Sequence, residues 1–296
     1  MPPSSTYKSS APSFPLLLLL STFAFHCTLA TEVCMPSSLL YEITKPLNLT
    51  HLHLSNFTYP NVPNPVRGLR SVLPFSPGDP IMTIPHANIF SLLSFSSHPI
   101  FSQIALPPLD DPDFVALVIA VLHEVASPTP WGTLLRSVDL TSFPSMLTES
   151  EITSKYSTSK YPLNLLPNIL ASRAVVLDDA SLFSQYISPL LPSPPPTYHA
   201  ILTAITLVTS RNFGLTIPLI PYSPNVQRRV MVPIAELMNV NHTAAVGDAA
   251  TCELTLDGFV CRATVEVEAG GELFFYYDEM ERGEYIVNYG YDPVGE

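Results

Sequence analysis

Residues 232–239 read VPIAELMN and carry the strongest signal for the architecture of this chain. The stretch places one carboxylate, Glu236, and one amide, Asn239, in an otherwise apolar segment. From residue 230 onward the pattern is mostly short strands and turns, including an aromatic strand at 273–277. We therefore expect the stretch to lie in a β-rich part of the molecule.

Upstream of this stretch the chain predicts helices. Residues 198–213 repeat apolar side chains at helical spacing, and residues 178–188 suggest another helix that prolines terminate. Residues 111–126 have an aspartate as cap and a proline at the first helical position. Residues 67–85 read as strand, turn and strand. The predicted layout is β, then a helical middle, then β.

Six short motifs occur along the chain in an order that is typical of one family. They are Arg67-Gly68-Leu69 with Gly78-Asp79 and Ile84-Pro85, then Leu122 to Trp131, Ser210-Arg211-Asn212-Phe213, residues 232–239, Gly270 to Tyr277, and Glu284 with Tyr289-Gly290-Tyr291. Together they resemble the SET domain of lysine methyltransferases similar to the Rubisco large-subunit enzyme, over roughly residues 64–292. The resemblance implies an α+β SET-domain fold of several small β-sheets, with a helical insert at about residues 111–225.

The resemblance also implies an activity. It is that of a protein-lysine N-methyltransferase that uses S-adenosyl-L-methionine and acts on a protein or peptide with an accessible lysine. In-line displacement needs the neutral amine aimed at the methyl group, so positioning in a narrow channel should supply much of the rate. Oxygen atoms around the transferring methyl group can hold it by C–H···O contacts.

Two tyrosines are implied as catalytic residues. Tyr277 stands where the family has its active-site tyrosine, and Tyr289 where a second tyrosine lines the pocket. For both residues, the alternative is an aromatic side chain that simply packs in the core.

Further site residues follow from the same motifs. The resemblance implies cofactor binding by Arg67, Gly68 and Arg211, and substrate binding by Glu236, which stands where the family usually has aspartate. A guanidinium at position 211 can clamp a carboxylate. The alternatives are a cation that interacts with the helix dipole for Arg211 and a solvated surface acid for Glu236.

The cofactor motif departs from the family pattern. The family's Asn-His pair appears either as Asn239 followed by valine or, two residues later, as Asn241-His242. Asn241 also begins an N-x-T sequon, and a glycan there would compete with the cofactor. Gly271 stands where glutamate is usual, and Val66 replaces a second glycine in the opening strand.

These departures motivate an alternative function. The family usually continues into a helical substrate-binding domain, whereas this chain stops six residues after Gly290. The alternative is a non-catalytic SET-like binding protein of the secretory route.

Composition excludes several other classes. The chain has 296 residues, 47% of them hydrophobic, which allows one large domain or two small ones. Its 11 glycines form neither a nucleotide-binding loop nor a G-x-S-x-G elbow, and the absence of H-E-x-x-H and C-x-x-C predicts no metal site. The net charge of −12 and a single adjacent basic pair, Arg228-Arg229, predict no nucleic-acid partner.

The N-terminal 30 residues predict a signal peptide. Lys8 precedes an apolar run that ends in the small-residue stretch Thr28-Leu29-Ala30. We expect cleavage and no stable membrane span afterwards, with an uncleaved anchor as the alternative. Residues 31–63 form a flanking segment before the SET-like region. The predicted location is the secretory route, with a plastid reached through that route as the alternative.

Residues 252–261 predict a hairpin around the Asp257-Gly258 turn. Pairing outward from this turn sets Leu254 opposite Cys261 and makes Cys252 a diagonal neighbour of Cys261. Both a disulfide and two buried free thiols are compatible with that placement.

Overall fold

The computed structural model describes residues 37–58, 66–92, 111–158, 161–191, 193–216, 227–240, 250–255, 257–275 and 282–290. All of them belong to one compact unit, Met35–Glu296. Tyr277, Asn241 and His242, all predicted site residues, lie outside the described residues, as does the predicted signal peptide.

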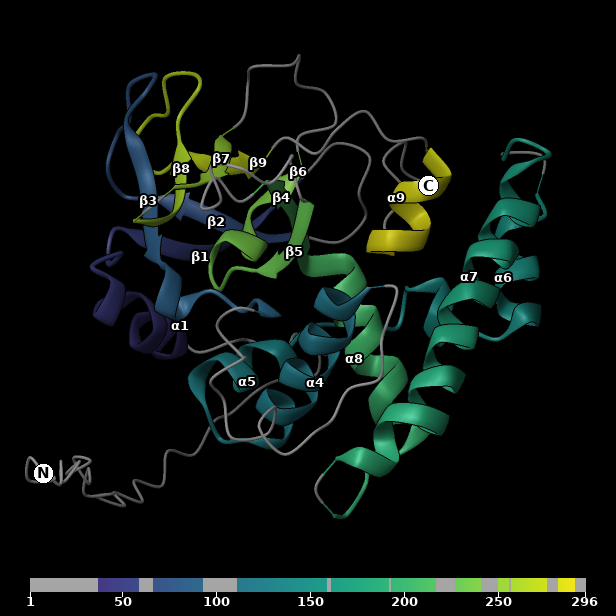
Figure 1. The fold of residues 1–296 in the computed structure, drawn as a ribbon. Coiled ribbons are helices and arrows are strands. Elements are labelled where there is room, and N and C mark those ends of the chain that lie inside the picture. The colour runs from purple at the N-terminus through teal and green to yellow at the C-terminus, as the bar shows by residue number, and fades with distance from the viewer. Residues whose placement is uncertain are drawn as a thin grey trace, which may run out of the picture. The chain divides into compact units, whose positions relative to one another are not determined.

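The strands of the described residues form three small sheets (Figure 1). The first has four strands in the order β1 (Leu52–Phe57), β2 (Val66–Ser71), β9 (Glu272–Phe275) and β6 (Asn239–Val240). The second has three, in the order β3 (Pro80–Pro85), β8 (Gly258–Arg262) and β7 (Thr251–Leu254), and the third pairs β4 (Asn212–Thr216) with β5 (Gln227–Met231). The predicted α+β class with several small sheets is confirmed.

Helices occupy the middle of the chain, as predicted, and two further described helices lie outside it, one before the first strand and one after the last. The described helices are α1 (Ser37–Thr44), α4 (Pro112–Ala126), α5 (Pro130–Arg136), α6 (Glu149–Tyr156), α7 (Leu165–Leu182), α8 (Tyr198–Arg211) and α9 (Arg282–Tyr289). Figure 1 shows α4 next to the strands with α5 and α8 packed beside it, and α6 and α7 side by side farther out. A π-helical segment, Phe183–Ile187, continues α7, and short 3-10 turns include Ala235–Leu237.

The start of α4 is confirmed where the sequence predicted a cap. Asp111 accepts a hydrogen bond from the backbone N–H of Phe114 at 2.9 Å, and Pro112 opens α4. The helix predicted to begin at residue 178 begins instead at Leu165. The apolar residues of α7 are spread around the helix rather than along one stripe, so periodicity did not reveal its first half.

β1 joins the four-stranded sheet although it lies in the predicted flanking segment. It pairs with β2 in an antiparallel register from Leu52 opposite Ser71 to Phe57 opposite Val66. The strand thereby covers the outer edge of β2, whose residues include Arg67 and Gly68.

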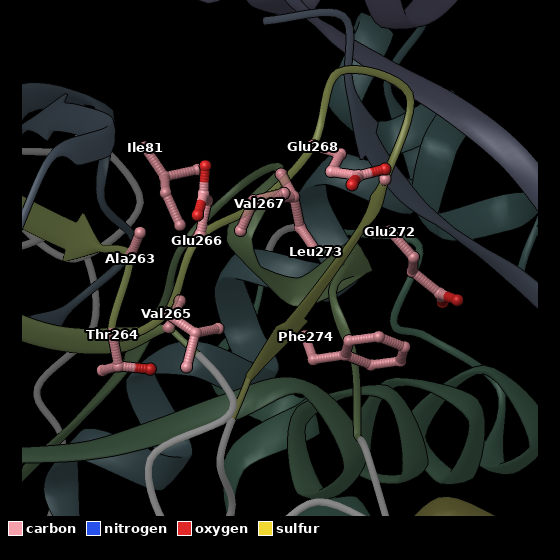
Figure 2. Close-up of a pocket in the computed structure, with 12 residues that line it drawn as sticks. Ile81, Ala263, Thr264, Val265, Glu266, Val267, Glu268, Glu272, Leu273 and Phe274 are labelled. Carbon is pink, nitrogen blue, oxygen red and sulfur yellow. The ribbon is translucent and has the colours of Figure 1, made fainter. Parts of the chain in front are cut away.

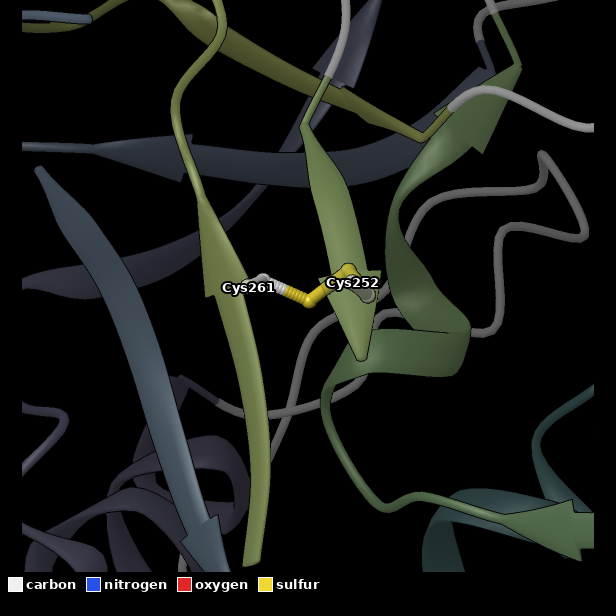
Figure 3. Close-up of a disulfide and its surroundings, with 2 residues drawn as sticks. All are labelled: Cys252 and Cys261. Atoms are coloured by element: carbon white, nitrogen blue, oxygen red, sulfur yellow. A yellow bond between two sulfur atoms is a disulfide. The ribbon is translucent and has the colours of Figure 1, made fainter. Parts of the chain in front are cut away.

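The hairpin forms, but its predicted register is wrong. Cys252 lies directly opposite Cys261 and is bonded to it in a disulfide (Figure 3), while Leu254 faces Phe259. The backbone at Gly258 has φ +142° and packs so closely on β3 that a Cβ there would overlap the Ile84 carbonyl oxygen. Gly258 therefore belongs to β8, and the turn moves one residue toward the N-terminus.

Two clusters of buried apolar side chains hold the unit together. The larger one joins the strands to α4, α5 and α8. The smaller one contains Ile152, Tyr156, Tyr161, Leu165, Ile169 and Ile286, and it ties α9 to α6 and α7. Among the described residues no single helix is long and apolar enough to cross a bilayer, although α4 and α5, bent by 98°, reach that length and hydropathy as a pair.

Candidate functional site

Three predicted site residues come together where β2, the end of α8 and the turn Ala235–Leu237 meet. Arg211, the last residue of α8, donates from Nη1 to the backbone carbonyl of Glu236 at 3.2 Å. Arg67 on β2 donates from Nη1 to Ser137 Oγ at 3.2 Å, and its charge acts on both Arg211 and Glu236. Residues far apart in the sequence thus form one charged group, in which Glu236 is buried and the two arginines are partly buried.

Glu236 is the buried acid of this group, with only 7% of its surface exposed. One carboxylate oxygen, Oε1, accepts a hydrogen bond from Trp131 Nε1 at 3.2 Å. Burial raises the pKa of Glu236, while Arg211, the Trp131 N–H and Arg67 act in the opposite direction. Glu236 is therefore not a solvated surface acid.

Two polar atoms of this group have no hydrogen-bond partner. Glu236 Oε2 and Arg211 Nε are both buried and unpaired in the part of the chain that the structure describes. Buried polar groups are nearly always paired, so unpaired ones call for an explanation such as a ligand. Arg211 Nε donates and Glu236 Oε2 accepts, so together they suit an anionic and a cationic ligand group that lie close to each other.

Positive charge exceeds negative charge in this group. Burial lowers the pKa of Arg67, the nearby charge of Arg211 lowers it further, and Glu236 opposes both. Two guanidinium groups therefore share one carboxylate. A carboxylate from a ligand would balance the second guanidinium, because planar guanidinium groups bind carboxylates well.

The backbone just before Glu236 is strained. Ile234 is fully buried at φ 77° and ψ −53°, a region that β-branched residues rarely occupy. Such a conformation costs of the order of 1–3 kcal/mol and persists only where its surroundings hold it. The turn continues with a hydrogen bond from Glu236 N to Val232 O at 3.2 Å, and it directs Glu236 into the core.

A second set of site residues lies on the opposite face of the four-stranded sheet. Side chains alternate along a strand, so Gly68 faces away from Arg67. A Cβ at Gly68 would overlap Asn239 Nδ2 and would lie 2.8 Å from Glu272 Oε1. Asn239 Nδ2 in turn donates to Glu272 Oε1 at 2.8 Å. The missing Cβ makes room for this amide–carboxylate pair.

Glu272 is a residue of this site that the sequence interpretation missed. The motif alignment put Gly271 in the place of the family's glutamate, whereas Glu272 comes one residue later and meets Asn239. The Gly-Glu pair at 271–272 could have revealed it, because the family's motif also begins with Gly-Glu. The bond to Asn239 depends on β6 and β9 lying in parallel, with Asn239 opposite Phe274, and sequence spacing alone does not reveal that pairing.

Tyr289, the second predicted tyrosine, lies at the end of α9. Its ring is partly buried and lies 6.1 Å from the ring of Tyr285, measured between centroids. Ile286 of the same helix joins the smaller apolar cluster. The structure thus places Tyr289 on the helical side of the unit.

A cavity of about 260 Å³ opens beside β9 (Figure 2). Its lining includes Glu266, Glu268 and Glu272 together with apolar side chains from β3, β9 and the segment before β9. Figure 2 shows the Glu272 side chain pointing away from Ala263 and Thr264. Glu272 therefore connects this cavity to the Asn239 side of the sheet. Within the described ranges, no three histidine, cysteine or acidic side chains are placed to hold a metal ion.

Known structures with the same architecture exist. No protein-family model matches the chain, and no curated protein matches its sequence. The SET domain of LSMT bound to lysine and AdoHcy matches with a TM-score of 0.63 and 17% identity, over 86% of this chain and 57% of that one. Rubisco LSMT bound to AdoMet gives 0.62 and 19%, over 86% and 55%. Rubisco LSMT bound to sinefungin and monomethyllysine gives 0.63 and 18%, over 87% and 56%.

These matches establish the fold class. The chain has the fold of a SET domain, as its motif order predicted. The part of the Rubisco LSMT structures that it matches is their SET portion. The chain spans little more than half the length of those proteins.

Proposed function

We propose that the protein is an S-adenosyl-L-methionine-dependent protein-lysine N-methyltransferase. The observation that carries the proposal is the charged group of Arg67, Arg211 and the buried Glu236 within a SET fold. Its unpaired donor, Arg211 Nε, suits the carboxylate of the cofactor, and its unpaired acceptor, Glu236 Oε2, suits the ammonium group of a lysine substrate. Similar structures are bound to AdoMet, AdoHcy, lysine or methyllysine, all of which carry such groups.

The residues present fit the implied cofactor by charge. Arg211 and Arg67 would hold the carboxylate of its amino-acid part, and the motif pattern is what supports Gly68 and Asn239 as further cofactor-binding residues. When bound, S-adenosyl-L-methionine supplies the methyl group. The protein's own part is to balance charge, to exclude water and to orient the two reactants.

The substrate in this proposal is a lysine side chain of a protein or peptide. Glu236 attracts the cationic amine, because its Oε2 atom has no other partner among the described residues. Tyr277 and Tyr289 are proposed to line the transfer site with their hydroxyl oxygens.

Calorimetric titration of the full chain with S-adenosyl-L-methionine and with its demethylated product tests the proposal. We expect both to bind, and we expect Arg211→Ala to weaken binding at least tenfold, since it removes the guanidinium that faces the ligand carboxylate. Arg262→Ala is the matched control, because Arg262 is exposed and its side chain donates, among the described residues, only to Gly78 O. Absence of binding to either ligand would contradict the enzymatic function.

Two observations favour the second candidate function, a non-catalytic SET-like binding protein of the secretory route. Asn239 Nδ2 is engaged by Glu272, and Cys252 is bonded to Cys261. Disulfides form and persist in oxidising compartments such as the ER lumen, which supports a secretory location. Mass spectrometry of protein from its native host distinguishes the two. A glycan on Asn241 supports the binding protein, whereas a bare Asn241 together with cofactor binding supports the enzyme.

A further inference from the structure

The single tryptophan of the chain directs its polar edge at the site acid. Trp131 is 6% exposed and lies on α5, and its indole N–H donates to Glu236 Oε1 at 3.2 Å. A lone buried tryptophan is ordinarily interpreted as a core anchor. The N–H of a buried tryptophan usually finds a hydrogen-bond partner, and here that partner is the carboxylate of the site acid.

Phe90 holds the indole ring by stacking on its face. Phe90 stacks on it with 3.8 Å between ring centroids and 11° between ring planes. Phe90 exchanges two backbone hydrogen bonds of 2.8 Å with Met231, the last residue of β5. The chain runs directly from Met231 into the turn that contains Glu236, so the ring and the carboxylate are positioned from the same strand.

We propose that Trp131 is a positioning residue for Glu236: its N–H fixes Oε1, and Oε2 is thereby presented to the cationic amine of the substrate. The proposal rests on the proposed methyltransferase function. Three elements bring charged or polar groups to Glu236: Arg211 from α8, Arg67 from β2 and Trp131 from α5. Of the three, Trp131 is the one that donates to the carboxylate itself.

The N–H also favours the ionised carboxylate. Burial raises the pKa of Glu236, and the Trp131 hydrogen bond counteracts that rise. Removal of the donor should move the proton affinity of Glu236 upward. At neutral pH a smaller fraction would then be ionised, and the amine would bind more weakly.

Trp131→Phe is the test, since phenylalanine keeps a ring for Phe90 to stack on and lacks the N–H. We expect the titration of Glu236, followed by NMR of glutamate-labelled protein and assigned by its loss in Glu236→Gln, to rise by roughly one pH unit. We expect KM for a lysine peptide at pH 7 to rise several-fold while kcat changes less, and we expect this difference to shrink at pH 9.

Phe90→Leu is the matched control, because it removes the stacking partner and keeps the N–H. Its Glu236 titration should stay within a few tenths of a unit of the wild type. Equal shifts in the two variants, or no shift in Trp131→Phe, would overturn the positioning role. If Trp131→Phe does not fold, β-(3-benzothienyl)alanine at position 131 replaces the N–H by sulfur at nearly constant ring size, and the same shift is expected.

The titration separates this inference from the proposed function. A shifted Glu236 titration in a protein without methyl transfer would support the positioning role and contradict the enzyme. An active enzyme with an unshifted titration would contradict the positioning role alone.

Discussion

Two sheets of this protein are made of similarly short strands but differ in what their residues do. In the three-stranded sheet, β8 is buried from Gly258 to Cys261, and the disulfide bonds it to β7. The four-stranded sheet instead carries Arg67 on one face and the Asn239–Glu272 pair on the other. The first sheet contributes mainly to stability, and the second carries residues of the proposed ligand site. Substitutions in the first should therefore lower stability, and substitutions in the second should mainly change binding.

The largest effect is expected from Gly258→Ala in the three-stranded sheet. The added Cβ would overlap the Ile84 carbonyl oxygen, and the backbone there has φ +142°. Strain and overpacking together should lower the free energy of unfolding by about 3–4 kcal/mol. Urea denaturation measures this change.

Gly270→Ala is the matched control for that substitution. Gly270 also has positive φ, at +86°, but an added Cβ would have no atom within 4 Å. It should cost about 1–2 kcal/mol from strain alone. Equal losses in the two variants would show that the contact with β3 is unimportant.

The next effect is expected from replacing both cysteines of the disulfide by serine. Cys252 and Cys261 are nine residues apart, and closing so short a loop is worth about 2–3 kcal/mol by chain entropy. We expect the double variant to lose that much in urea denaturation and to become insensitive to reducing agents. Cofactor affinity should be nearly unchanged, and a large loss of affinity would contradict the division between the sheets.

Gly68→Ala tests the role of the four-stranded sheet in binding. The added Cβ would displace Asn239 and crowd Glu272, which should cost about 1–3 kcal/mol of stability. The proposed function predicts in addition a loss of cofactor binding in calorimetry, larger than the stability change explains. Gly214→Ala in β4 has open space around its added Cβ and should affect neither property. Unchanged cofactor binding in Gly68→Ala would remove Gly68 from the site.

The smallest effect concerns the pH dependence of stability. Burial raises the pKa of Glu236 in the folded protein, so the folded state favours the protonated acid. Its contribution to stability is full below the ordinary glutamate pKa of about 4.3 and is lost as the pH rises through the folded value. Wild type should therefore lose stability relative to Glu236→Gln over that range, by about 1.4 kcal/mol per unit of pKa difference. Parallel pH profiles would show that Glu236 is not perturbed.

Local signals predicted the parts of the fold that depend on neighbouring residues. Asp111 and Pro112 mark the start of α4 because a cap acts within one turn. The hairpin register depends on a contact between Gly258 and β3, more than 170 residues earlier in the chain, so the Asp-Gly turn signal misplaced it. The start of α7 was missed because its apolar residues follow no single stripe.

The residues of the site were predicted from the sequence, but the contacts between them were not. The motifs along the chain were sufficient to establish a SET-like order and to nominate Arg67, Gly68, Arg211, Glu236 and Asn239, since residue types and their sequence are all that such a pattern needs. The partnership of Trp131 with Glu236, the burial of that acid and the Asn239–Glu272 pair arise only in the folded chain. Hydrogen bonds and desolvation act between atoms a few ångströms apart, and those distances are set by the packing of sheets and helices rather than by separation along the sequence.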